Sequence, residues 1–198
     1  QQRGLLALHA SAISTPRGAV AFLGHSGRGK STLAAHFARR GWRVLADDLV
    51  VVHFDEAGKP MAMPGLPQFK LWPRSLAVLG DEAEILPRLR PQTDKRVLNF
   101  HESFCREPQP LARLYVLETD AAGSAIKSSE PTVLDRVRLL LHYTYRAQYL
   151  RGLCMQQAHF KSLSQVAAAV PVRRVTRPED GQFRLEELAA LLTDDFNG

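Results

Sequence analysis

The sequence of 198 residues lacks the marks of several protein classes. Its two cysteines, Cys105 and Cys154, lie far apart and outside any C-x-x-C spacing, so we expect neither a disulfide scaffold nor a zinc site. Arg, His or Gly interrupts every apolar run well before about 18 residues, and no signal peptide is visible. We therefore expect a protein of the reducing cytoplasm that has no membrane partner.

The sequence also has no internal repeat, no low-complexity tract and no aromatic-plus-basic module of the kind that binds RNA. The formal net charge is +6, but the basic residues are scattered, which suits either a solvated surface or an anionic partner, and no nucleic acid is expected. With 45% hydrophobic and 23% charged residues, we predict one catalytic domain over 1–198. Because the chain begins at Gln1, an N-terminal domain could be missing from it.

Local patterns in the first third predict two hairpins and a helix. Residues 5–14 alternate as a strand, TPRG predicts a tight turn, and AVAFLG predicts a buried strand, which together make an antiparallel hairpin. Residues 30–40 have helical spacing, and Gly41 is a suitable C-cap. Residues 42–54 are apolar enough for one long strand, and DEAGKP after it predicts the turn of another hairpin.

The rest of the chain mixes strands and helices without a plain βαβ alternation. Between Met61 and Pro110, Pro, Arg and Lys are frequent, which predicts loops and short elements laid over the core. LARLYVLET predicts a strand, TVLDRVRLLLHYTYRAQYL one amphipathic helix, VPVRRVTRP an edge strand, and RLEELAALLTDDF a closing helix. We expect an α/β fold with a mixed sheet, antiparallel hairpins and flanking helices.

Residues 24–31, GHSGRGKS, satisfy the phosphate-loop pattern G-x-x-x-x-G-K-[ST] in full. The glycines let backbone N–H groups converge on phosphate oxygens, and the start of the following helix adds partial positive charge. Lys30 can reach the outer phosphates, and the Ser31 hydroxyl can bind Mg²⁺. We predict a site for ATP and Mg²⁺ formed by Gly24, His25, Ser26, Gly27, Arg28, Gly29, Lys30, Ser31 and Thr32.

Two adjacent acids, Asp47 and Asp48, come one helix and one turn after Lys30, on a strand expected beside the strand that leads into the phosphate loop. Neighbouring side chains of a strand point to opposite faces, so both reach the phosphates only if the strand kinks or ends there. Because unpaired buried charge is costly, we predict that one acid supports Mg²⁺ and the other accepts a proton from an attacking hydroxyl. His9 is either a third member of this group or a packed residue.

The segments LHASAIS and GAVAFLGHSGRGKSTLAAHFARRGWRVLADDLVVV resemble the catalytic core of the HPr serine kinase/phosphorylase family. The resemblance implies a fold related to the ATP-dependent phosphoenolpyruvate carboxykinases and the transfer of phosphate from Mg·ATP to a protein serine. It also implies that Lys30 and Ser31 serve phosphates and metal, with Asp47 as the candidate base. Asp48 and His9 are then its neighbours, and Asp48 joins Ser31 as a metal-binding candidate.

The middle of the chain departs from that family. It has neither the glycine-rich signature with a metal-binding glutamate nor the basic motif linked to phosphorolysis. The segments PGLPQFKLWPRSL, RPQTDKRV and LLLHYTYRAQYL instead look like the HPr-kinase-like lasso peptide precursor kinases, which phosphorylate a hydroxyl at the C-terminal end of a precursor. This second resemblance implies a peptide or small protein as the acceptor. HPr kinases assemble as hexamers, so a homo-oligomer is an open expectation.

Further cations are candidates for the transferring phosphoryl group or an acidic acceptor, because charge spreads over the equatorial oxygens during transfer. These candidates are Lys70, Lys95 and Arg96. Trp72 suits packing or adenine stacking equally, whereas Arg146, Tyr143 and Tyr145 are expected on a helix face and in the core.

The leading hypothesis is an ATP- and Mg²⁺-dependent kinase that acts on a serine-type hydroxyl of a peptide or small protein, such as a lasso peptide precursor. The alternatives are an HPr-type serine kinase/phosphorylase, a P-loop ATPase or nucleotide switch without an acceptor, and a kinase of small molecules. The early and doubled acid favours a hydroxyl acceptor over a motor, in which the acid normally follows a longer insertion.

Overall fold

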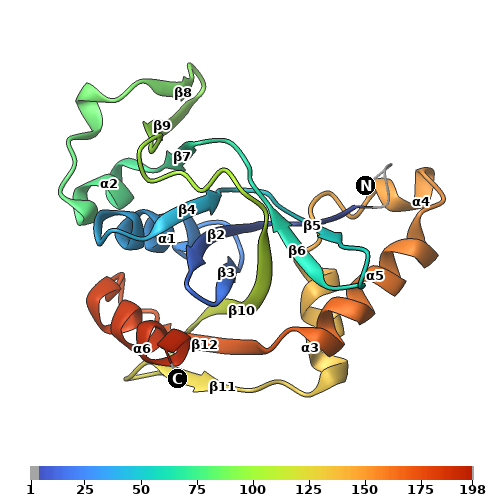
Figure 1. Cartoon of the computed structure of the whole chain (residues 1–198). Coiled ribbons are helices and arrows are strands. Elements are labelled where there is room, and N and C mark those ends of the chain that lie inside the picture. The colour runs from blue at the N-terminus through green and yellow to red at the C-terminus, as the bar shows by residue number, and fades with distance from the viewer. Residues whose placement is uncertain (1–4, 198) are drawn as a thin grey trace.

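The structure, a computed structural model, describes residues 5–197 and is built around a mixed β-sheet (Figure 1). Its strands are β1 (Leu6–Leu8), β2 (Ala10–Thr15), β3 (Gly18–Leu23), β4 (Arg43–Ala46), β5 (Val50–Phe54), β6 (Pro60–Met63), β7 (Gln68–Leu71), β8 (Arg88–Arg90), β9 (Thr93–Asn99), β10 (Gln109–Asp120), β11 (Lys127–Ser129) and β12 (Val172–Pro178). Its helices are α1 (Lys30–Arg39), α2 (Pro73–Leu79), the 3-10 helix η1 (Ala83–Ile85), α3 (Val133–His142), α4 (Tyr149–Gly152), α5 (Gln156–Ala169) and α6 (Leu185–Asn197). The expected mixed α/β class is confirmed.

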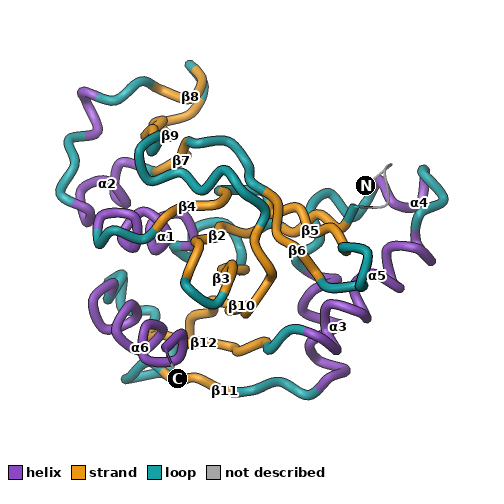
Figure 2. The backbone as a smooth tube through the Cα atoms, in the orientation of Figure 1, coloured by secondary structure: helices purple, strands orange, loops and turns teal. Residues whose placement is uncertain are grey.

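The main sheet runs in the order β1-β5-β6-β10-β3-β2-β4, with β12 and β11 added beyond β10. Strand β10 is parallel to β3 and β12, and the other strand pairs of this sheet are antiparallel. Helices α1, α2 and α6 gather on one side of it, and α3, α4 and α5 on the other (Figure 2). No helix of the described chain is both long and apolar enough to span a membrane.

Alternation along β3 divides the apolar interior into two clusters, because successive strand side chains point to opposite faces. Phe22 stacks on Phe37 of α1, with ring centroids 5.8 Å apart, in the cluster between the sheet, α1 and α6. Ala21 and Leu23 belong to the other cluster, which includes Leu163 of α5. The strand that leads into residues 24–29 is therefore fully buried and held from both faces.

The predicted hairpins and the first helix are confirmed. Strands β2 and β3 pair antiparallel around the turn at Pro16 and Arg17, and β5 and β6 pair across the DEAGKP turn. Helix α1 ends at Arg39, and Gly41 follows it with a φ of 88°, which glycine adopts without strain. These elements depend on local turn chemistry, which a sequence shows directly.

The strand predicted over residues 42–54 is wrong as a single element, because it is broken between Ala46 and Val50. The kink required for both acids to approach one site is thus present. The expectation that the acids would follow a strand beside β3 is also wrong, since β2 lies between β3 and β4. The β2–β3 hairpin occupies that edge of β3, and β10 occupies the other.

The segment between Met61 and Pro110 is more ordered than predicted. Strands β7, β9 and β8 form a small antiparallel sheet, and α2 packs beside it against α1 (Figure 1). The proline and arginine content that suggested loops instead marks the ends of short strands, such as Pro67 before β7 and Pro87 before β8.

The C-terminal half differs from the sequence prediction in four respects. The amphipathic helix ends at His142, and residues 143–148 turn before α4 begins. Its spacing predicts Val133, Val137, Leu140, Leu141 and Tyr145 on or near one apolar face. Of these, Leu140 is buried, but Val133 is 59% and Leu141 is 46% exposed. Strand β12 is not an edge strand, because it pairs with β10 and β11. Helix α5 lies in a stretch for which the sequence predicted no element.

Replacement of Gly18 tests how closely the hairpin packs on β10. A Cβ at Gly18 would lie 2.3 Å from the Pro110 backbone oxygen at a φ of +123°, whereas a Cβ at Gly58, at +77°, would meet no atom within 4 Å. We expect Gly58→Ala to lower the free energy of unfolding by about 1–2 kcal/mol, from backbone strain alone. Gly18→Ala should cost at least about 2 kcal/mol more, because backbone must shift. Urea unfolding of both variants measures the difference, and equal losses would contradict the close packing.

Candidate active site

A cleft of about 430 Å³ lies where β3 ends and α1 begins. The phosphate loop forms its floor, and residues of the β7–α2 segment form the facing wall. The lining side chains include His9, Ser26, Lys30, Ser31, Thr32, Asp48, Lys70, Trp72, Arg74, Ser75, Lys95 and Phe183. The tertiary fold therefore brings most of the predicted site residues to one cavity.

The loop has the backbone that phosphate binding needs. Gly24, Gly27 and Gly29 have φ values of 150°, 84° and 88°, and a Cβ at Gly24 would lie 2.8 Å from the Leu117 backbone oxygen. Helix α1 begins after Gly29 with no side-chain cap and no acidic residue in its first turn. Its first N–H groups are thus left for an anion, and the helix dipole favours one there.

Lys30 is only 6% exposed and folds back over its own loop. Its ammonium donates to the backbone oxygens of Gly24, at 2.8 Å, and His25, at 3.1 Å. Burial lowers the pKa of Lys30 to about 8, although Asp47 and Asp48 act in the opposite direction. The lysine is therefore poorly solvated, and phosphate oxygens are stronger partners for it than two carbonyl groups.

Asp47 points toward the start of α1. Its carboxylate accepts hydrogen bonds from the Ser11 hydroxyl at 2.6 Å, from the Lys70 backbone N–H at 3.3 Å, and from the Ser31 hydroxyl. Burial raises the pKa of Asp47, and these three hydrogen bonds counteract the shift. The residue does not line the cleft, and its carboxylate is directed at the Ser31 side chain.

Asp48 lies in the cleft and has a side chain that is 36% exposed. The Lys70 ammonium is 3.1 Å from its carboxylate, and Nδ1 of His9 is 3.4 Å from the other carboxylate oxygen. Burial raises the pKa of Asp48, but the hydrogen bond and charge of Lys70 outweigh it, so the net pKa is below its usual value. Asp48 is thus held as an accessible carboxylate.

His9 occupies the gap between β1 and β2 and fixes the backbone around Asp48. Its Nδ1 lies 3.0 Å from the Asp48 carbonyl oxygen, so this nitrogen bears the proton and donates. Burial, and then the positive charge of Lys30, lowers the pKa of His9. A neutral His9 that donates through Nδ1 leaves Nε2 as a free acceptor.

The three predicted cations separate in the structure. Lys70 and Lys95 line the cleft, and the ammonium of Lys95 lies 5.4 Å from the ring centroid of Trp72, which is 44% exposed. Arg96 is elsewhere, because its guanidinium donates to the Leu86 backbone oxygen at 3.2 Å. On β9, neighbouring residues point to opposite faces, so Lys95 and Arg96 cannot both face the cleft.

Other loop residues contact the C-terminal half of the chain. Nε2 of His25 lies 3.1 Å from Nε2 of His142, at the end of α3. Arg28 pairs with Glu179 at 2.8 Å and also bonds to Thr119. These contacts place two of the predicted nucleotide-binding side chains against protein partners. The Arg28 backbone N–H is also occupied, because it donates to the His25 carbonyl oxygen at 3.2 Å.

Residues at the α2 end of the cleft were not among the predicted site residues. Ser75 accepts a hydrogen bond from Thr32 at 2.9 Å, and the guanidinium groups of Arg74 and Arg177 lie 5.5 and 5.7 Å from the ring centroid of Phe183. No local motif marks these residues. Phe183 lines the cleft and lies close to Gly29, where an added Cβ would be 3.5 Å from the ring, and this approach depends on the tertiary fold.

The residues beside Lys30 suit Mg²⁺ that arrives with a phosphate. Among the described residues, no group of three His, Cys, Asp or Glu side chains could hold a metal ion by itself. Ser31 and Asp47, however, place a hydroxyl and a carboxylate against each other at the phosphate loop. Mg²⁺ prefers such oxygen ligands and is commonly bound by one or two carboxylates together with substrate phosphates.

The low pKa of Lys30 predicts pH-dependent phosphate binding. Above pH 8 the Lys30 side chain is mostly neutral, whereas a bound polyphosphate stabilises its charged form. Binding above pH 8 therefore protonates Lys30. We expect the Kd of inorganic triphosphate to rise by up to about tenfold per pH unit from pH 8 toward the free lysine value. Calorimetry at pH 8.5 in buffers of different ionisation enthalpy measures the proton uptake. Lys30→Met should bind weakly and without uptake, and absence of uptake by the wild type would contradict the assignment.

Comparison with known proteins gives little beyond this geometry. Neither a family model nor a curated protein matches the chain. Among solved structures, the chain is similar to the Hpr(Ser) kinase/phosphatase from Coxiella burnetii, with 10% sequence identity and a TM-score of 0.46. The similarity covers 97% of this chain and 99% of that one. With so low an identity, no residue role is transferred from it.

Proposed function

We propose that the protein is a Mg·ATP-dependent kinase that transfers the γ-phosphoryl group to a serine-type hydroxyl of a peptide or small protein. One observation supports this most directly. The carboxylate of Asp48 opens into the cleft that the phosphate loop floors, and Lys70 and His9 hold it there. A nucleotide-binding site with an accessible carboxylate at the same cavity has the parts for an incoming alcohol.

The phosphate loop supports a nucleoside triphosphate as the donor. Its glycines and the uncapped start of α1 provide N–H donors, and Lys30 supplies a cation that lacks a carboxylate partner within ion-pair distance among the described residues. Lys70 and Lys95 add positive charge on the facing wall. Charge of this sign on both walls stabilises the equatorial oxygens as the phosphoryl group moves.

Asp48 is the residue that we assign to the acceptor. The hydroxyl oxygen forms a new bond to the γ-phosphorus, the bond from that phosphorus to the bridging oxygen breaks, and ADP leaves. The hydroxyl proton passes to the Asp48 carboxylate, as positioned aspartates accept it in kinases. Lys70, at 3.1 Å, orients the carboxylate and keeps it ionised before the acceptor binds.

The two acids thus exchange the roles that the family resemblance implied. Asp47 faces Ser31, so we assign Asp47 and Ser31 to the metal side of the site. When bound there, Mg²⁺ would neutralise charge on the phosphates. Asp47 also fixes the wall of the cleft, because it accepts the Lys70 backbone N–H and thereby joins the broken strand to β7.

The acceptor is proposed to be a peptide, with a lasso peptide precursor as the specific case and HPr as the alternative. Support for the first comes from the segments PGLPQFKLWPRSL and RPQTDKRV, which supply Lys70, Trp72 and Lys95 to the cleft. Incubation with ATP and Mg²⁺, followed by mass spectrometry, distinguishes the cases. Phosphate gained by a precursor peptide supports the first, gain by HPr supports the second, and hydrolysis without transfer to either supports an ATPase.

The exchanged roles make different predictions for two substitutions. Asp48→Asn should retain nucleotide affinity but lower the transfer rate by about 10²-fold or more, because the proton acceptor is lost. Asp47→Asn should raise the Mg²⁺ concentration needed for half-maximal activity, because the ligand set is weakened. Transfer is followed by phosphopeptide formation, and nucleotide binding by fluorescence of a labelled ATP analogue.

Glu56→Gln is the matched control, because Glu56 is an exposed acid in the β5–β6 turn. This substitution should change neither the transfer rate nor the Mg²⁺ concentration needed for half-maximal activity. If Asp48→Asn transfers phosphate at the wild-type rate while Asp47→Asn does not, then Asp47 is the proton acceptor, as the family resemblance implied. Our assignment of Asp48 as the proton acceptor is then rejected.

A further inference from the structure

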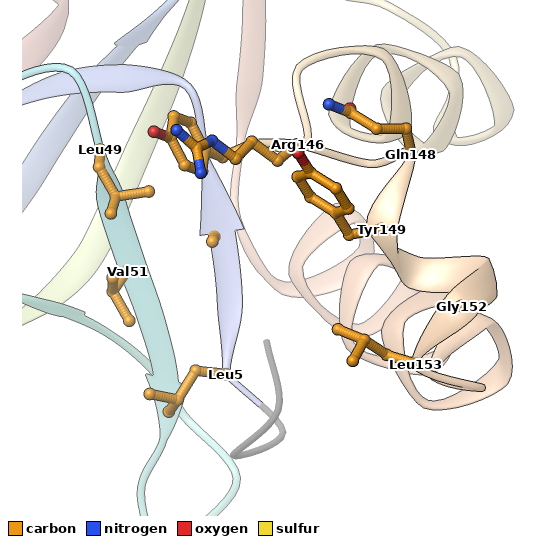
Figure 3. A pocket seen from close by; sticks show the side chains of 10 residues that line it. Leu5, Leu49, Val51, Arg146, Gln148, Tyr149, Gly152 and Leu153 are labelled. Atoms are coloured by element: carbon orange, nitrogen blue, oxygen red, sulfur yellow. The ribbon is translucent and has the colours of Figure 1, made fainter.

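A second cavity, of about 730 Å³, opens between the β1–β5 edge of the main sheet and helix α4 (Figure 3). Ala7, Leu49 and Val51 line it from the strands, and Tyr149 and Leu153 line it from the helical side. Figure 3 shows Arg146 extending across one end of the space. We call this the apolar cavity; among the side chains that line it, Arg146 is the only charged one.

The apolar cavity adjoins the acceptor end of the cleft. Leu49 directly follows Asp48, and the ring of Tyr145, which lines the cavity, lies 6.5 Å from the ring of His9. The Tyr145 backbone N–H donates to the Ala7 oxygen at 2.8 Å, so the turn after α3 is tied to β1. Asp48 lines the cleft and the next residue, Leu49, lines the apolar cavity, so the two spaces lie next to each other at this point of the chain.

The positive charge of Arg146 at the cavity indicates a ligand that carries negative charge. The Arg146 guanidinium stacks on Tyr145, with its carbon 5.3 Å from the ring centroid, and pairs with no carboxylate among residues 5–197. Arg146 also has a φ of 52°, which is unusual for a residue other than glycine. An arginine held over an apolar space, without an acidic partner of its own, suits a ligand with a carboxylate beside an apolar group.

We propose that the apolar cavity binds the acceptor peptide through a bulky apolar side chain and an adjacent carboxylate. Leu49 and Val51 are two positions apart and both line the cavity, so an extended segment that passes Asp48 meets them within about three residues, at about 3.3 Å per residue. The acceptor hydroxyl lies at Asp48, the apolar side chain packs between Val51 and Leu153, and the carboxylate pairs with Arg146. This inference rests on the proposed kinase function.

A peptide set tests the inference. Each synthetic peptide has one central Ser. Either Leu or Gln is placed, in separate peptides, at each of the three positions before and the three positions after this Ser. The residue next to the Leu or Gln is either Asp or Lys. When the Leu stands at the position that reaches the apolar cavity, we expect the Leu-Asp peptide to have at least about a tenfold higher kcat/KM than the Gln-Asp peptide. The reason is that the apolar side chain is transferred from water into the cavity. Fluorescence anisotropy of the same peptides, labelled, measures binding separately from transfer.

Two substitutions examine the cavity itself. Tyr149 is 54% exposed, so Tyr149→Ser should fold normally yet remove most of the preference for Leu over Gln. Arg146→Glu should reverse the preference from Asp to Lys. Arg151→Glu, an exposed change on the same helix, is the charge control and should alter neither preference. Nucleotide affinity should be unchanged in all three variants.

The outcomes separate the cavity from the kinase function. Selective binding with selective transfer supports both, and selective binding without transfer supports the cavity alone and contradicts the kinase function. Transfer that ignores the Leu-to-Gln change, or a preference that survives Tyr149→Ser, overturns the cavity inference while the kinase function stands. If no peptide binds in the presence of a non-hydrolysable Mg·ATP analogue, the cavity inference is overturned as well.

Discussion

The break between β4 and β5 is the constraint on which the candidate site depends. An unbroken strand would send the side chains of Asp47 and Asp48 to opposite faces of the sheet. Instead Asp48 adopts a φ of 70°, a left-handed conformation that costs a non-glycine residue on the order of 1–2 kcal/mol. Contacts from Lys70 and His9 to Asp48 offset that cost. The result is one acid at the start of α1 and the other in the open cleft.

Burial shifts the pKa of three charged groups in and beside the cleft. Lys30 is desolvated and bonded to carbonyl groups of its own loop, while burial raises the pKa of Asp47 and lowers the pKa of His9. Each of these groups is thus shifted toward its neutral form, and a highly charged ligand would reverse that preference for the lysine. Clusters of groups perturbed in this way are typical of functional sites.

The small β7–β9–β8 sheet and α2 complete the cleft from the side opposite the phosphate loop. They supply Lys70, Lys95 and Ser75, and the backbone N–H of Lys70 bonds to Asp47. Lys70 of this wall contacts both acids, through its backbone N–H to Asp47 and its ammonium to Asp48. The apolar cavity lies outside this wall and is lined by strands β1 and β5, the turn after α3, and α4, so it shares no lining residue with the cleft.

The sequence by itself determined the β2–β3 and β5–β6 hairpins, helix α1 and the glycine-rich loop that precedes it, because each depends on residues close together in the chain. It also predicted that two adjacent acids lie near that loop. It did not determine which acid faces the cleft, that Lys95 and not Arg96 lines it, or that Arg74 and Phe183 border it. Those outcomes depend on β2 separating β4 from β3, on the register of β9 and on where α3 ends. Such choices are set by packing between segments far apart in the chain, and only the tertiary structure decides them.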